Sequence, residues 1–148
     1  MTLYKVLDEH RMPIHGGSGR WELRKWMPTI TDIRLCARGY HLVEDSQVLE
    51  WLGPTLWVAE GRGASLTDGT KTVFEQARLI RQVRGWTLTN QKLFAADCAE
   101  YVLPIYEAAY PNDDRPRMAI KATRDFAMGL IGAAAGAAAG AAAGAAAR

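Results

Sequence analysis

The sequence contains only two cysteines, Cys36 and Cys98, and they do not form a Cys-x-x-Cys pair. This scarcity excludes a disulfide-rich secreted scaffold and the usual finger or ribbon type of zinc site. Residues 1–11 carry charged side chains where a signal peptide would have an apolar run. We therefore expect a cytoplasmic protein with two free thiols and no disulfide.

The chain also lacks a large excess of charge of either sign. Lys and Arg number 18 and Asp and Glu number 16, which gives a net charge of +2. This near balance does not by itself indicate a polyanionic partner. The uncharged stretch 126–147 is long enough to span a bilayer, but alanine and glycine are too weakly apolar to drive insertion, so we expect no membrane contact.

Residues 1–131 have the composition of one α+β domain. We expect a small, mostly antiparallel sheet from residues 3–60, covered by three to four helices from residues 71–131. Strands are predicted at 3–7, 21–26, 30–35, from Gly39 to Leu42, and at 55–60, a short helix at 46–52, a loop at 61–69 and a longer helix at 71–84. Five tryptophans, at positions 21, 26, 51, 57 and 86, suit either a core or a binding surface.

The tail, residues 132–148, is an Ala/Gly low-complexity segment with a glycine at every fourth position. Alanine favours a helix, and each interior glycine costs on the order of 1 kcal/mol, so the tail alone would be a marginal helix. Glycines four residues apart leave a smooth face that lets another helix approach closely. We expect the tail to be helical when docked, and the disordered alternative remains open.

Two helical patterns meet between residues 97 and 129. The first has an apolar side with amphipathic spacing, formed by Phe94, Cys98, Tyr101, Val102, Ile105 and Ala109. Pro104 predicts a kink or break in that helix. Asp113 or Asp114 can cap the second helix, and Pro116 suits its first turn. The second helix is expected to place Ala119, Ala122, Thr123, Phe126, Leu130 and Ile131 inward and Arg117, Lys121 and Arg124 outward.

The order CAEYVLPIYE, an acidic turn and then DRPRMAIKATRDFAMG resembles the immunity proteins of bacterial polymorphic-toxin systems. The most specific part is the Asp-Arg-Pro-Arg-x-Ala-Ile element from Asp114 to Ile120. The tail departs from that family, because it carries glycines where the family mostly has alanine and arginine. The run Cys-x-x-Gly-Tyr-His at residues 36–41, with the later Trp-rich strand ending in Ala-Glu-Gly, resembles a domain of unknown function common in bacteriophages and actinobacteria.

The resemblance implies a small intracellular protein-binding inhibitor of the toxin-immunity or phage counter-defence type, which acts by binding rather than by catalysis. Its protein partner would be a toxin or a defence-system component. The residues we expect to contact that partner are Asp113, Asp114, Arg115, Arg117, Lys121 and Arg124, with exposed tryptophans as anchors. A purely structural role of the same turn, as a helix cap with solvated arginines, stays open.

Two other functions remain as alternatives. An ADP-ribosyltransferase-like, NAD-binding enzyme would use His15, Tyr40 and His41 with Glu60 at a strand end, although no motif of that family is complete. A nucleic-acid-binding accessory protein would use two basic helix faces, formed by Arg78, Arg81 and Arg84 and by Arg117, Lys121 and Arg124. Exposed arginines of this kind more often pair with nearby acids.

The residues His10, His15, Cys36 and His41 are of metal-ligand type, but their spacing is too wide for a common zinc site. We expect no metal and no cofactor, and a site at these four residues stays open. The loop His15-Gly16-Gly17-Ser18-Gly19 can approach a ligand closely. It lacks the lysine and the following helix of a P-loop, so a flexible connection is the simpler interpretation.

Overall fold

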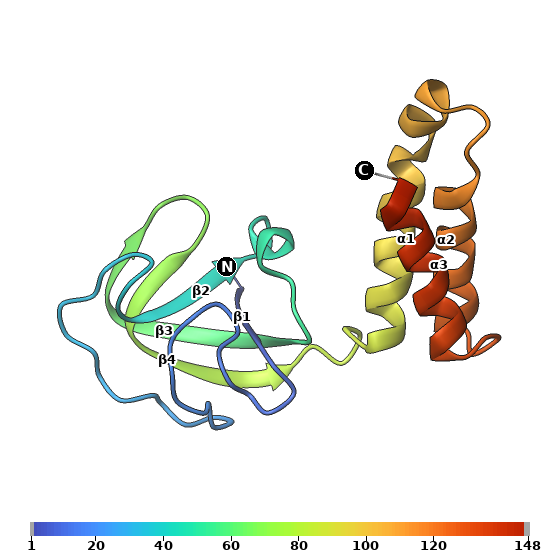
Figure 1. Ribbon diagram of the computed structural model, residues 1–148. Coiled ribbons are helices and arrows are strands. Elements are labelled where there is room, and N and C mark those ends of the chain that lie inside the picture. Colours follow the sequence, from blue (N-terminus) through green and yellow to red (C-terminus); the bar gives the residue numbers. More distant parts are fainter. Residues whose placement is uncertain (1, 147–148) are drawn as a thin grey trace. The chain divides into compact units, whose positions relative to one another are not determined.

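The computed structural model describes residues 2–146 and shows an α+β fold with four antiparallel strands and three α-helices (Figure 1). This confirms the predicted fold class. The contacts divide the chain into two compact units, Met1–Trp86 and Thr87–Arg148. We call them the barrel unit and the helical unit and describe each by itself. The expectation that residues 1–131 form a single domain stays a prediction.

The barrel unit is a small closed barrel with the strand order β1-β2-β4-β3. Its strands are β1 (Leu3–Leu7), β2 (Tyr40–Glu44), β3 (Thr55–Thr67) and β4 (Thr72–Gln82), with a short 3-10 helix, η1 (Val48–Trp51), before β3. Strand β1 pairs antiparallel with both β2 and β3, and β4 closes the barrel by pairing with the same two strands. The core inside consists of Leu7, Trp21, Leu42, Trp57, Ala59, Ala77 and Leu79.

The helix predicted at residues 71–84 is wrong, because residues 72–82 form strand β4. Val73, Ala77 and Leu79 are fully buried, and they occupy alternate positions of a pleated strand. The helical interpretation arose because Val73, Ala77, Ile80 and Val83 also fit a spacing of three and four. The pairing of β4 with β3 in a long hairpin selects the strand over the helix. The same pairing extends β3 through residues 61–67, where a loop was expected.

The connection between β1 and β2 is largely irregular. The predicted strands 21–26 and 30–35 are wrong, since only isolated bridges occur there, such as Leu23 with Leu79. The connection is nevertheless fixed to β4, because backbone amides of Arg24, Met27 and Ile30 donate to carbonyls of that strand. Trp21 lies within this connection and is only 2% exposed. This segment is therefore hydrogen-bonded to the sheet without adding a further strand to it.

The helical unit contains α1 (Leu88–Ala109), α2 (Arg115–Ala127) and α3 (Ala133–Ala146), which lie side by side and are joined by short turns (Figure 1). The side-chain oxygen of Thr87 caps α1 by accepting from the Asn90 amide. Helix α1 continues through Pro104, so the predicted break does not occur. The tail is helical through residue 146, and its last two residues lie outside the described residues.

The buried centre of the helical unit is small and consists of Ala96 and Leu103 of α1 and Ile120 of α2. Gly136 of α3 faces Phe126 of α2, and a Cβ atom placed on this glycine would lie 3.4 Å from the Cβ of Phe126. None of the helices in the described part of the chain combines the length and the apolar character needed to cross a bilayer.

Candidate functional site

The basic residues expected to bind a partner lie along the line where α1 and α2 pack, which we call the α1–α2 seam. Arg117 of α2 donates to both carboxylate oxygens of Glu107 on α1, at 2.6–2.9 Å. Arg124 bridges Asp97 and Glu100 of α1, each at 2.7 Å. The pairs cross between the two helices, so these arginines help to hold α1 and α2 together.

The seam also contains a shallow pocket of about 260 Å³. Arg117, Lys121 and Arg124 all line it, so the structure brings three of the six predicted contact residues to one surface. Its floor includes the buried Leu103 and Ile120, and Glu100, Asp125 and Met128 complete it. Lys121 pairs with Asp125 on its own helix at 2.6 Å. An apolar floor with a rim of charge pairs is the usual composition of a protein-binding surface.

Charge pairs of this exposure are easily exchanged for pairs with a partner. The side chains of Arg117 and Lys121 are 61% and 68% exposed. Exposed ion pairs typically contribute only about 0–1 kcal/mol, because water screens them and holding two long side chains costs entropy. Among the buried side-chain nitrogen and oxygen atoms of the described residues, the Nε of Arg124 has no hydrogen-bond partner.

The other three predicted contact residues form the turn before α2. Asp113 accepts from the backbone amide and the guanidinium of Arg115 and from the Tyr106 hydroxyl, at 2.7–3.1 Å. The Arg115 guanidinium, followed by the Tyr106 hydroxyl, holds the pKa of Asp113 well below its usual range. Asp114 occupies the N-cap position but makes no capping hydrogen bond with its side chain. Asp113 is therefore the residue that satisfies a free amide at the start of α2.

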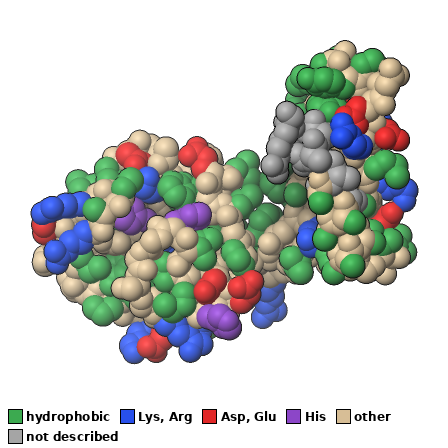
Figure 2. Space-filling view, viewed as in Figure 1, with side chains coloured by type: hydrophobic (Ala, Val, Ile, Leu, Met, Phe, Trp, Pro, Cys, Tyr) green, Lys and Arg blue, Asp and Glu red, His purple; other side chains and the backbone are tan. Residues whose placement is uncertain are grey.

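The apolar side of α1 is not its core side. We call Phe94, Cys98, Tyr101, Val102 and Ile105 the apolar stripe; Tyr101 is 88% exposed and Ile105 76%. The buried residues Ala96 and Leu103 lie on the opposite side of the same helix, where α2 packs. Hydrophobic side chains are visible at the end of the helical unit where α1 leads into α2 (Figure 2). Sequence reasoning identified the stripe but not its exposure, which depends on the position of α2.

The expected inward face of α2 is only partly right. Ala119, Ala122, Thr123 and Phe126 are half-buried, but Leu130, which follows the helix, is 68% exposed. The most buried residue of α2 is Ile120, which the sequence analysis did not select. Helix α2 has two covered sides, because Ile120 packs with Leu103 of α1 and Phe126 faces Gly136 of α3.

Residues considered for catalysis or metal binding lie in the barrel unit. His15, Cys36, Tyr40 and His41 line one cavity there, and Glu60 does not. Glu60 instead pairs with Arg78 of the neighbouring strand at 2.7 Å, so the ADP-ribosyltransferase-like arrangement is not assembled. Arg78 and Arg81 lie on a strand, and the basic helix face predicted from them does not exist.

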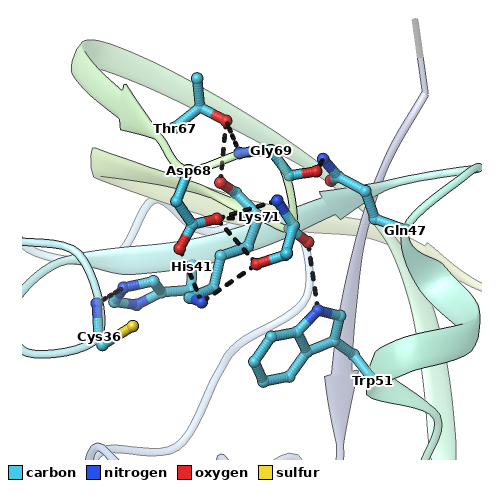
Figure 3. Close-up of polar contacts among 9 residues, drawn as sticks. Cys36, His41, Gln47, Trp51, Thr67, Asp68, Gly69 and Lys71 are labelled. Atoms are coloured by element: carbon cyan, nitrogen blue, oxygen red, sulfur yellow. Dashed lines mark hydrogen bonds and ion pairs between the residues drawn. The ribbon is translucent and has the colours of Figure 1, made fainter.

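Within residues 2–146, no three His, Cys, Asp or Glu side chains are grouped so that they could hold a metal ion. The Nε2 atom of His41 is already occupied, because it accepts from the backbone amide of Cys36 at 3.0 Å (Figure 3). Burial, followed by the charges of Lys5 and Lys71, lowers the pKa of His41 below its usual value. This imidazole is therefore neutral at pH 7 and acts as a clamp on the segment 36–41. Cys36 and Cys98 are both free and exposed.

Comparison with known proteins supports the resemblance found in the sequence. Residues 89–148 match the model of a family described as Imm-5 like putative immunity protein. The matched segment covers α1, α2 and α3 almost completely and includes the seam and the apolar stripe. No curated protein and no solved structure matches the chain.

Proposed function

We propose that the protein is a cytoplasmic inhibitor of the toxin-immunity type, which binds a protein toxin through its helical unit and neutralises it without catalysis. The observation that carries the proposal is the exposed apolar stripe of α1, which lies opposite the core side of the helix. The family match over residues 89–148 supports it, because that family is described as an immunity protein. A phage counter-defence role would use the same surface against a different partner.

The stripe and the seam have complementary roles in this proposal. Large apolar side chains at the centre of an interface supply most of the binding free energy, and Tyr101 and Ile105 are the most exposed ones on α1. Charged side chains at a rim select the partner and speed association. Arg117, Lys121 and Arg124 would contact acidic side chains of the toxin, and Asp113, Asp114 and Arg115 would contribute at the end of the helical unit.

The charge of the helical unit favours a protein over a nucleic acid. Residues 87–148 contain six Lys or Arg and six Asp or Glu. The basic side chains of the seam already have acidic partners within the unit. A polyanion would bring its phosphates close to those acids, whereas a protein surface with both signs of charge can pair with the basic and the acidic members.

The proposal is tested by affinity capture with the tagged full-length chain from bacterial lysates, followed by co-expression of the captured protein with and without the chain. We expect one stoichiometric partner that arrests bacterial growth when expressed alone and no longer does so with the chain present. Tyr101→Glu should abolish capture, because it places a charge at the centre of the stripe. Leu49→Glu is the matched control, since Leu49 is also exposed but lies in the barrel unit.

A partner without toxic activity, or capture that is unaffected by Tyr101→Glu, would reject the proposal. Thermal unfolding of Tyr101→Glu distinguishes an interface from a folding role. Replacement of an exposed side chain should change the stability by only about 0.5 kcal/mol. Reversal of charge at Lys121 and Arg124 tests the rim, and unchanged affinity would remove these two residues from the interface.

A further inference from the structure

The barrel unit contains a cavity of about 390 Å³ that partner binding by the helices does not use. Its wall is assembled from segments that are distant in sequence: β1, the loop around residues 13–18, the segment 36–41, and the side chains of Trp51 and Lys71. A volume of this size lies within the range of about 300–1,000 Å³ that is typical of small-molecule sites. Both motifs singled out in the barrel sequence, the His-Gly-Gly-Ser-Gly loop and the Cys-x-x-Gly-Tyr-His run, meet in this wall.

The charged side chains in the described wall are all basic. Lys5, Arg38 and Lys71 line the cavity, and no Asp or Glu does. Lys71 is 8% exposed and donates to Asp68, just outside the wall, at 3.0 Å. In the close-up its ammonium group points toward His41 and Cys36 (Figure 3). Because Asp68 balances Lys71, the excess positive charge of the wall comes from Lys5 and Arg38, and this excess favours an anionic ligand.

Lys5 provides the strongest argument for a ligand. It lies between Leu3 and Leu7 on the face of β1 that packs against the core cluster, where an apolar side chain would be more stable. Its ammonium group donates to the backbone carbonyl of His41 at 3.2 Å, and no carboxylate pairs with it among the described residues. Burial lowers the pKa of Lys5 to about 8. Lys5 is half-buried, so a cation there without a counter-charge is still costly to the fold, and a bound anion would supply that counter-charge.

Aromatic rings form the other part of the wall. Trp21 and Tyr40 meet edge to face with ring centres 5.5 Å apart, and His15 and Trp51 do so at 5.4 Å. The Lys5 ammonium lies 5.4 Å from the Trp21 ring centre, and that of Lys71 lies 4.7 Å from the Trp51 ring centre. Indole rings offer flat apolar surfaces on which a planar ligand can stack. The cations and rings are thus placed for a ligand with a charged part and a flat part.

The loop at residues 15–19 leaves part of the cavity wall without side chains, at Gly16 and Gly17. Gly16 and Gly17 have φ angles of +85° and +90°, which favour glycine, and a Cβ atom on Gly16 would meet no atom within 4 Å. Both residues line the cavity. Backbone atoms of this loop are accessible to a ligand because no side chain covers them.

We propose that this cavity is a binding site for a small anion attached to a planar ring, of the chemical class of a nucleoside 5′-monophosphate. The anionic group lies between the ammonium groups of Lys5 and Lys71. The ring stacks against the indole of Trp51, which is only half-buried, whereas Trp21 belongs to the closed core. The site binds the ligand without chemical change.

The test is titration of the full-length chain with AMP, GMP, CMP and UMP in separate experiments, followed by calorimetry and by quenching of tryptophan fluorescence. Adenosine and inorganic phosphate are the two comparison ligands. We expect saturable binding of at least one nucleotide with a dissociation constant below about 1 mM. Adenosine and phosphate should each bind at least tenfold more weakly, because each lacks one half of the proposed contacts.

Two variants locate the site. Lys5→Met should weaken nucleotide binding at least tenfold, and Trp51→Leu should weaken nucleotide binding but leave the weak binding of phosphate unchanged. Lys25→Met is the matched control, because Lys25 is exposed, pairs with Glu22 and does not line the cavity. The proposal is overturned if no nucleotide gives saturable binding, if phosphate alone binds as tightly as the nucleotides, or if Lys5→Met binds like the wild type.

Discussion

Replacing Lys5 by methionine should stabilise the barrel unit at pH 7, because it removes a half-buried ammonium group that has no carboxylate partner among the described residues. The pKa of Lys5 falls from 10.5 to about 8 on folding. At about 1.4 kcal/mol per pKa unit, the charged form costs roughly 3 kcal/mol. The variant loses a hydrogen bond to the His41 carbonyl and a cation–π contact with Trp21, together about 1.5 kcal/mol. We expect a net gain of about 1–2 kcal/mol.

The difference in stability between Lys5→Met and the wild type should also depend on pH. Below pH 8 both the folded and the unfolded wild type hold the proton, and the folded state carries the full cost. Between pH 8 and 10.5 the folded state releases its proton first, so the wild type gains stability as the pH rises. Methionine does not titrate. The difference between variant and wild type should therefore shift by roughly 2 kcal/mol in favour of the wild type between pH 7 and pH 10.

Urea unfolding followed by tryptophan fluorescence measures this effect selectively. All five tryptophans lie within residues 1–86, so their emission reports the barrel unit, while far-UV circular dichroism reports mainly the helices. Lys25→Met serves again as the control and should show no such pH dependence. A variant at Lys5 that is less stable than the wild type at pH 7, or a stability difference that is the same at pH 7 and pH 10, would refute the reasoning.

Three further substitutions test other parts of the fold. Leu103→Ala should destabilise the helical unit by about 2–4 kcal/mol, seen as lower helicity on heating, because Leu103 forms a third of its small buried centre; an unchanged melting curve would contradict that core. Gly39→Ala should destabilise the barrel by roughly 2–3 kcal/mol in urea, since Gly39 has φ +118° and an added methyl would overlap Val73. Asp113→Asn should lower the melting temperature at pH 7, because the carboxylate paired with Arg115 has a lowered pKa and stabilises the fold only while it is ionised. The difference in melting temperature between variant and wild type should therefore become smaller as the pH falls below 3.8. A difference that does not change with pH would argue against the ion pair.

Local signals in the sequence were sufficient for some elements. The strand at residues 3–7 was predicted with its observed bounds, and the strand near Gly39–Leu42 was displaced by only one or two residues. The acidic turn and the start of α2 followed from Asp113, Asp114 and Pro116. In each case neighbouring residues determine the conformation, through alternation in the strand or through capping in the turn.

Elements that depend on distant partners could not be predicted in this way. The segment 72–82 satisfies both a helical and a strand period, and pairing with β3 selects the strand. The apolar stripe of α1 has helical spacing, but its exposure depends on which side α2 covers. The cavity in the barrel was also missed as a unit, because Lys5, Trp51 and Lys71 approach His41 only when the barrel closes. The basic residue between Leu3 and Leu7 was the signal that could have indicated it.

The four-residue repeat in the tail has a consequence for how this protein can vary between strains. Helix α3 packs against α2, with Gly136 facing Phe126, and each unit of three alanines and one glycine adds about one turn to the same helix. Loss or gain of one such unit leaves the sequence that contacts Phe126 unchanged. Repetitive DNA changes length by replication slippage, and here a change of twelve base pairs keeps the reading frame, so natural variants should differ in tail length by multiples of four residues.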